Sequence, residues 1–289
     1  MGEAARLKHG NRLPAGKRSL SGPDREALRQ AVLVLEHPSL VARLSGFVGK
    51  PVELVGNLLP RAASGLVARA SRAALGAALK LAFTTLPKTP MRRGRLLHKA
   101  LAATSGALGG VVGIVSLPVE LPLATTLILR SIAEIAQGEG EDLADPATAL
   151  ACVQVFALGG GQSEGDNPAE SGYFAVRAAL AQSMAEAAHF VAEHGFVGQG
   201  APVLIRLAAE ISSRFGVVVS QKIAAQAVPL VGALGGAAVN TAFMTHYQSI
   251  AHAHFTVRRL ERTYGKETVR ARYENIRRDE ARRAAAGEG

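Results

Sequence analysis

Two long stretches without a charged side chain constrain the fold of this 289-residue chain more than any other feature. The first spans residues 100–119 and, after Glu120, continues apolar to Leu129; the second spans residues 223–247. Each reaches the roughly 20 apolar residues that a membrane-spanning helix needs. Both are interrupted by proline and rich in alanine and glycine, which gain little from transfer into lipid. We therefore expect either a helix–break–helix that dips into a bilayer or a hairpin buried in a helical core.

Helix-start patterns recur along the chain. Ser21–Asp24 forms a capping box, Asp145 and Asn167 each precede a proline, and Pro202 opens another apolar-periodic segment. No stretch of strand length alternates apolar and polar residues. The sequence therefore predicts an all-α fold.

The predicted architecture is a helical bundle around the two glycine-rich segments, at about residues 100–136 and 217–247. Glycines recur there at four-residue spacing, which lets helix backbones approach closely. Amphipathic basic helices are expected outside, and Arg61, Arg69 and Arg72 give the helix over residues 61–83 a basic face.

Charge is distributed unevenly along the chain, which has a net charge of +10. Residues 1–99 hold 18 Lys and Arg against 5 Asp and Glu, residues 100–215 hold 4 against 12, and residues 216–289 hold 11 against 6. Basic ends around an apolar middle favour an anionic membrane surface or lipid as partner, with the basic helices around 61–99 and 258–283 facing the headgroups. Nucleic acid is disfavoured because only 4% of residues are aromatic and the cations are spread over many helices.

Domain organisation is expected to be simple. Residues 1–20 are interpreted as a basic mobile tail, residues 21–275 as a single helical domain, and residues 276–289 as a charged C-terminal tail. The N-terminal residues lack the apolar core of a secretory signal. Cys152 is the only cysteine, which excludes an internal disulfide and fits a reducing compartment.

Motifs that suggest catalysis or metal binding are weak. Gly161–Gly165 matches the G-x-S-x-G nucleophile pattern with Ser163, but the neighbouring residues read as a helix end and an acidic loop, not as strand and helix. Glu186, His189 and Glu193 share a helix face without the further ligands of a di-iron site.

Three histidines near the end of the second apolar stretch, His246, His252 and His254, lack the four-residue spacing of helical zinc ligands. We therefore predict no catalytic residue, no metal site and no cofactor.

Glu120 is the exception, because it lies between Pro118 and Pro122 in the most apolar part of the chain. A charge in such a setting is paired or neutralised. The favoured interpretation is an acidic N-terminal element of a helix over 122–137. The alternatives are a contact with a lipid headgroup or partner, and general acid/base catalysis.

The stretch GALGGVVGIVSLPVELPLATTLILRSIAEIAQGEGEDL resembles the signature of the EcsC family, a glycine-rich helix that meets an L-P-x-acidic-L-P turn. The stretch AVPLVGALGGAAVNTAFMTHYQSIAHAHFTVRRLERTYG is similar to the same family, and the resemblance covers roughly residues 25–275. Ten matching positions are taken as signature sites of unknown role: Pro118, Glu120, Pro122, Thr126, Arg130, Gly232, Gly236, Asn240, Arg258 and Glu261.

The family takes its name from a gene beside a bacterial ABC transporter implicated in secretion, so the resemblance implies a bacterial, membrane-associated accessory protein. It supplies no catalytic residues. We expect a non-enzymatic accessory or regulatory protein on the cytoplasmic side of the bacterial membrane, with a transporter as a possible protein partner. The alternatives are a soluble cytoplasmic bundle that binds a lipid or other apolar ligand, and a hydrolase that uses Ser163 or Glu120.

Overall fold

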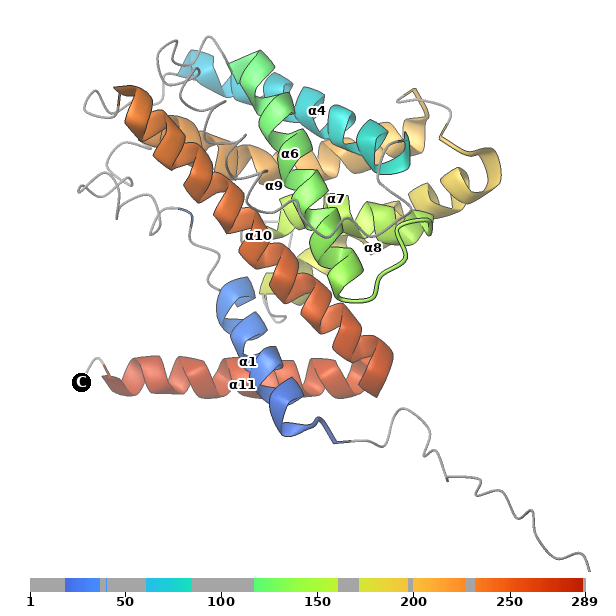
Figure 1. The fold of residues 1–289 in the computed structure, drawn as a ribbon, viewed down its shortest axis with the longest axis vertical. Helices are drawn as coiled ribbons and strands as arrows, with labels where there is room; N and C mark the ends of the chain where they lie inside the picture. Colours follow the sequence, from blue (N-terminus) through green and yellow to red (C-terminus); the bar gives the residue numbers. More distant parts are fainter. Residues whose placement is uncertain are drawn as a thin grey trace, which may run out of the picture.

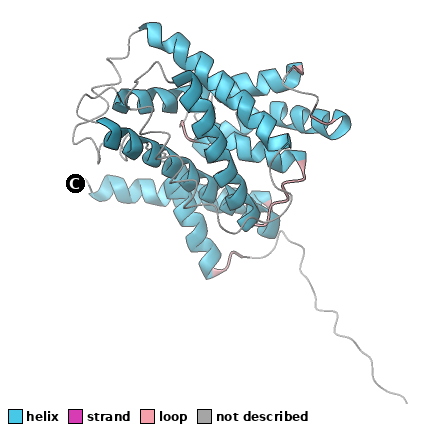
Figure 2. Ribbon diagram, turned by 45° about the horizontal axis from the view of Figure 1, so that its top comes forward, coloured by secondary structure: helices cyan, strands magenta, loops and turns pink. Residues whose placement is uncertain are grey.

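The computed structural model describes residues 19–36, 40, 61–84, 117–160, 172–196, 200–226 and 232–287. Within these ranges there are eight helices and no strand, so the predicted all-α class is confirmed (Figure 2). The helices are α1 (Gly22–Glu36), α4 (Arg61–Thr84), α6 (Leu117–Gly138), α7 (Pro146–Leu158), α8 (Gly172–His194), α9 (Pro202–Gln226), α10 (Gly232–Tyr264) and α11 (Lys266–Gly287).

Three helices begin where the sequence predicts. At the start of α1, Ser21 Oγ accepts a hydrogen bond from the Asp24 N–H at 3.2 Å and donates one to the Asp24 carboxylate at 2.8 Å. At the start of α7, the Asp145 side chain accepts the backbone N–H two residues further on, at 3.0 Å. α9 begins at Pro202. These caps satisfy N–H groups that have no partner within the helix.

α6 departs from the prediction of a helix over 122–137, because it begins at Leu117 and continues through Pro122. Pro118 lies in the first turn, where its missing N–H has no intrahelical partner to lose. Pro122 removes one bond near the helix start, and burial of α6 offsets that loss: Leu121, Leu129 and Ile132 are fully buried. The first arm of the expected helix–break–helix lies outside the described residues.

The long helix α10 connects two ends of the molecule (Figure 1). At one end α4 packs against α6 and α9, and α6 packs against α10. At the other end α1 lies against α10 and α11 (Figure 1). α7 packs against α4, α6, α8, α9 and α10, and residues 148–158 are all buried.

The turn after α7 contacts its neighbours closely. A Cβ on Gly160 would lie 2.8 Å from the backbone oxygen of Arg214, and one on Gly159 would lie 2.8 Å from the Tyr247 ring. Phe156 and Phe215 pack beside that ring, at 5.1 and 5.9 Å between centroids. The glycines are therefore required by close packing.

The carboxylate of Glu36, the last residue of α1, links three helices. It accepts the Tyr273 hydroxyl of α11 at 2.7 Å and the backbone N–H groups of Gly172 and Tyr173, at the start of α8, at 3.2 and 3.4 Å. Residues 276–287, which the sequence suggested as a charged tail, continue α11, and Ile276 is buried.

The predicted glycine-rich centre is described only in part. Residues 117–136 lie in α6 and residues 232–247 in α10, and these two helices pack against each other. Residues 217–226 end α9. Residues 100–116 and 227–231 lie outside the described residues, so a bundle organised around both complete segments stays a prediction.

Candidate functional site

Glu120 forms a buried ion pair between two helices. Its Oε1 accepts a hydrogen bond from Lys222 Nζ of α9 at 2.7 Å, and the side chains are 6% and 0% exposed. Lys222 Nζ also lies 5.1 Å from the centre of the Phe243 ring of α10. Burial lowers the pKa of Lys222, and the charge and hydrogen bond of Glu120 oppose that shift. The pair therefore links α6 to α9 through a buried side-chain contact.

The partner of Glu120 was not among the predicted residues, although the sequence carries a signal for it. Glu120 is the only charged residue between Lys99 and Arg130, and Lys222 is the only one between Arg214 and Arg258. A single carboxylate in one apolar segment and a single cation beside the other satisfy the requirement that buried charges be paired.

Two signature residues at the far end of α10 also form ion pairs. Arg258 donates to both oxygens of Glu141, at 2.8 and 2.9 Å, and Arg177 of α8 donates to both oxygens of Glu261, at 2.8 and 3.0 Å. Arg262 also contacts the Glu141 carboxylate. Burial alone would raise the pKa of Glu141, but Arg258 and Arg262 hold that pKa below its ordinary value.

The same network reaches α1. Arg259 donates to Glu139 at 2.9 Å and to Asp24 at 3.0 Å, and the Tyr264 hydroxyl donates to Asp24 at 2.6 Å. Hydrogen bonds from Tyr264, Arg259 and Ser21 lower the pKa of Asp24. Several α10 cations expected to face headgroups are therefore neutralised within the protein.

The histidines near the end of the second apolar stretch make structural contacts. His254 is buried, and its Nδ1 lies 3.0 Å from the Tyr173 hydroxyl. Burial, followed by the charges of Arg177 and Arg258, lowers the pKa of His254 well below 6.5. His246 Nε2 lies 3.3 Å from the Gly159 carbonyl oxygen.

Glu186 and Glu193 on the acidic face of α8 also form ion pairs. His189 Nε2 lies 3.2 Å from Glu193 on the exposed side of the helix, and Glu186 pairs with Arg206 of α9. Across the described residues no three His, Cys, Asp or Glu side chains are grouped so as to hold a metal ion. Ser163 and its glycine-rich loop lie outside the described ranges.

The remaining signature residues differ in their exposure. Pro118 and Arg130 are exposed, Pro122 and Thr126 are half-buried, and Asn240 is buried in α10. Gly232 is the first residue of α10, and Gly236 follows one turn later. The signature thus divides between the Glu120–Lys222 pair, the network at the far end of α10, and positions with separate surroundings.

A different surface carries cations that the described residues leave unpaired. Arg69, Arg72 and Lys80 of α4 are exposed, and no carboxylate in the described part of the chain pairs with them. α4 contains no Asp or Glu, while its opposite face buries apolar residues such as Val67 and Leu75. The predicted basic face is confirmed for Arg69 and Arg72; the Arg61 side chain lies outside the description.

An apolar groove lies between α4 and α9, and of these cations Arg72 lines it. It encloses about 180 Å³, and its wall includes Arg72, Leu79, Phe196 and Ile205. Phe196 stacks on Phe83 of α4 at 5.3 Å between ring centres, and Ile205 is 54% exposed. The α4/α9 surface, defined by Arg69, Arg72, Lys80 and this groove, therefore presents positive charge and accessible apolar side chains together.

None of the described helices is long and apolar enough to cross a membrane. Comparison with curated proteins and with solved structures finds no match. The model of the EcsC protein family matches residues 44–260, which run from before α4 to near the end of α10. This match spans three quarters of the chain, and it includes the buried pair and the α4/α9 surface. The chain therefore belongs to the EcsC protein family.

Proposed function

We propose that this protein is a non-enzymatic accessory or regulatory protein that binds an anionic membrane surface through the α4/α9 surface. The observation that carries the proposal is the combination of unpaired, exposed cations on α4 with an adjoining apolar groove. Anionic headgroups attract the cations, and apolar side chains at the groove insert at the acyl boundary. Its place is the cytoplasmic side of the bacterial membrane, where an export system or transporter is the expected partner.

The expected strength of binding suits a reversible association. Each Lys or Arg near an anionic surface contributes about 1 kcal/mol. Arg69, Arg72 and Lys80 together supply about 3 kcal/mol on that basis. Partial insertion of Ile205 and Phe196 adds to this at about 25 cal/mol per Å² of apolar area buried. These terms favour a peripheral protein that leaves the membrane when salt screens the charges.

Vesicle co-sedimentation tests the proposal. The full chain is mixed with phosphatidylcholine vesicles that contain or lack phosphatidylglycerol, and the bound fraction is measured at low salt. The double variant Arg69→Gln/Arg72→Gln removes two unpaired charges and is expected to bind about 30-fold more weakly. The variant Ile205→Ser tests the apolar contribution.

The matched control is Arg278→Gln/Arg282→Gln, which removes two exposed charges from α11 and is expected to bind like the wild type. Equal losses in both double variants would show general charge attraction and contradict a specific surface. Recovery of the protein wholly in the soluble fraction at low salt, without vesicle binding, would overturn membrane association and favour the soluble bundle with an apolar ligand.

A further inference from the structure

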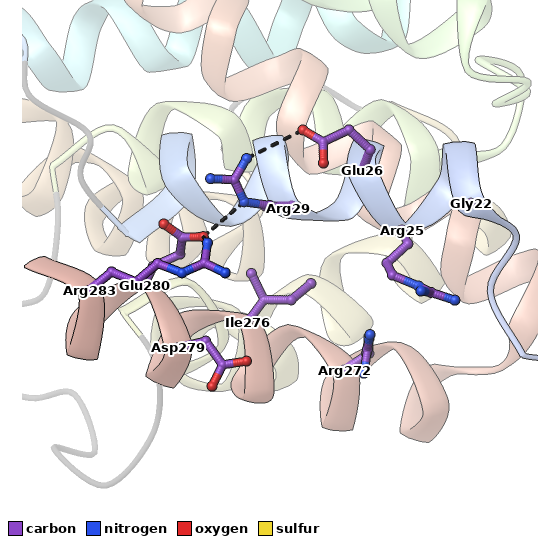
Figure 3. A pocket seen from close by; sticks show the side chains of 9 residues that line it. All are labelled: Gly22, Arg25, Glu26, Arg29, Arg272, Ile276, Asp279, Glu280 and Arg283. Carbon is purple, nitrogen blue, oxygen red and sulfur yellow. Dashed lines mark hydrogen bonds and ion pairs between the residues drawn. The ribbon is translucent and has the colours of Figure 1, made fainter.

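A second cationic feature lies between the first and last described helices. α1 and α11 enclose an open pocket of about 210 Å³ (Figure 3). Four arginines line it, two from each helix: Arg25, Arg29, Arg272 and Arg283. Its acidic lining residues are Glu26, Asp279 and Glu280.

The acidic residues of the pocket pair with arginines at one of its ends. Glu280 accepts hydrogen bonds from Arg29 at 2.8 Å and from Arg283 at 2.9 Å, and Glu26 lies 3.4 Å from Arg29 (Figure 3). Asp279 lies 4.0 Å from Arg282, outside the pocket lining. The positive charges at this end are therefore already balanced.

The other end holds two arginines that pair with no carboxylate among the described residues. Arg25 comes from the first turn of α1 and Arg272 from α11, and their guanidinium groups extend into the space between the helices (Figure 3). Gly22, the first residue of α1, lines the same end, so the positive end of the helix dipole adds to the field. Asp24, in the first turn of α1, bonds Arg259 and Tyr264 and not these two arginines.

We propose that this pocket binds a phosphate group between Arg25 and Arg272. A carboxylate has two oxygens in one plane, which a single guanidinium saturates; a phosphate presents three or four oxygens that two guanidiniums on facing helices share. Ile276, between the two ends in Figure 3, supplies an apolar wall for the organic part of a phosphorylated molecule.

The site is separate from the proposed membrane-binding surface. The family match covers residues 44–260, whereas α1 and α11 lie before and after it. The phosphate site is therefore built by the parts of this chain that flank the matched region. A bound phosphate would bridge the two helices and stabilise their contact.

The test compares soluble and lipid sources of the phosphate. Binding of inorganic phosphate and of glycerol 3-phosphate to the full chain is measured by calorimetry and thermal shift, against sodium chloride at equal ionic strength. In parallel, co-sedimentation uses phosphatidylcholine vesicles with phosphatidic acid. Arg25→Gln/Arg272→Gln is expected to weaken phosphate binding about tenfold or more for each guanidinium removed.

The variant Arg69→Gln/Arg72→Gln serves as the charge-matched control. It is expected to keep full affinity for soluble phosphate and to bind phosphatidylglycerol vesicles about 30-fold more weakly. Soluble binding that depends on Arg25 and Arg272 assigns the site to free phosphorylated molecules. If phosphatidic acid vesicles bind in a way that depends on Arg25 and Arg272, and the soluble phosphates do not bind, the site is assigned to a lipid headgroup. The proposal is overturned if neither ligand distinguishes Arg25→Gln/Arg272→Gln from the wild type, or if the control loses phosphate equally. Because the two double variants separate the readouts, failure here leaves the proposed membrane function intact.

Discussion

The ion pair that links α6 to α9, Glu120 with Lys222, is buried. At the far end of α10, Arg258, Arg259 and Glu261 instead pair with Glu141 in the turn after α6, Asp24 of α1 and Arg177 of α8. The side chains of Glu120 and Lys222 are almost fully removed from solvent, whereas Arg258, Arg259 and Arg262 at the other end are 26%, 35% and 42% exposed. Loss of one partner is therefore expected to reduce stability more at the first end, where the remaining charge stays buried, than at the second, where it stays in contact with water.

The largest expected effect tests the Glu120–Lys222 pair. Glu120→Leu leaves the Lys222 amine buried without its carboxylate, so the free energy of unfolding falls by about 3–5 kcal/mol. This exceeds the 0.5–2 kcal/mol that loss of a helix cap alone would cause. Chemical denaturation monitored by circular dichroism measures the difference.

The double variant Glu120→Leu/Lys222→Met is the control for that result. Replacing both charges by apolar side chains of similar size is often neutral or stabilising, so stability is expected to return to near the wild-type value. A double variant as unstable as the single one would mean that shape, and not the unpaired charge, explains the loss.

A smaller loss is expected in the network. Glu141→Gln removes the bidentate contact with Arg258, but Arg258 stays partly hydrated, so we expect a loss of about 2 kcal/mol. The variant also loses part of its acid sensitivity. Because the folded state holds the pKa of Glu141 below 4.5, its stabilisation is present above pH 4.5 and is lost as the pH falls through the lower folded value.

The matched control is Glu26→Gln, whose carboxylate is 59% exposed and lies 3.4 Å from Arg29. Exposed pairs of this kind contribute about 0–1 kcal/mol. Similar losses for Glu26→Gln and Glu141→Gln would argue against the distinction between buried and exposed members of these ion pairs.

The last effect concerns the pH range above the one in which carboxylates titrate. His254 stays neutral in the folded protein because its pKa is well below 6.5, while the unfolded chain binds a proton there. The neutral histidine therefore contributes to the free energy of unfolding above pH 6.5. This contribution is lost on acidification, by up to about 1.4 kcal/mol per pH unit. His254→Gln is expected to flatten stability between pH 6.5 and 5, and exposed His189→Gln is not. An unchanged slope in His254→Gln would rule out this histidine as the source.

Local signals predicted the local structure well. Ser21, Asp145 and Pro202 mark helix starts because capping depends on residues a few positions apart. The basic face of α4 follows from helical periodicity alone. Glu120 stood out because a charge between two prolines in an apolar run conflicts with its surroundings.

The partners of these residues were less predictable. Lys222 lies 102 positions from Glu120, and Arg258 lies 117 from Glu141, so each contact depends on how distant helices pack. The expectation that a helix begins at Pro122 was also wrong. Burial of the whole of α6 outweighs the one backbone hydrogen bond that this proline removes. Arg25 and Arg272 carry no local signal, since only the crossing of α1 and α11 brings them together.

Glu36 has a consequence for the order in which the chain folds. Its carboxylate ends α1, yet its partners Gly172 and Tyr273 lie 136 and 237 positions later. On a ribosome that adds about 5–20 residues per second, α1 has none of these contacts until most of the chain has been made. Closing such long loops slows folding. We therefore expect α1 to dock last, after the helices from α4 to α10 have packed. Its contacts then join the beginning of the described chain to its end.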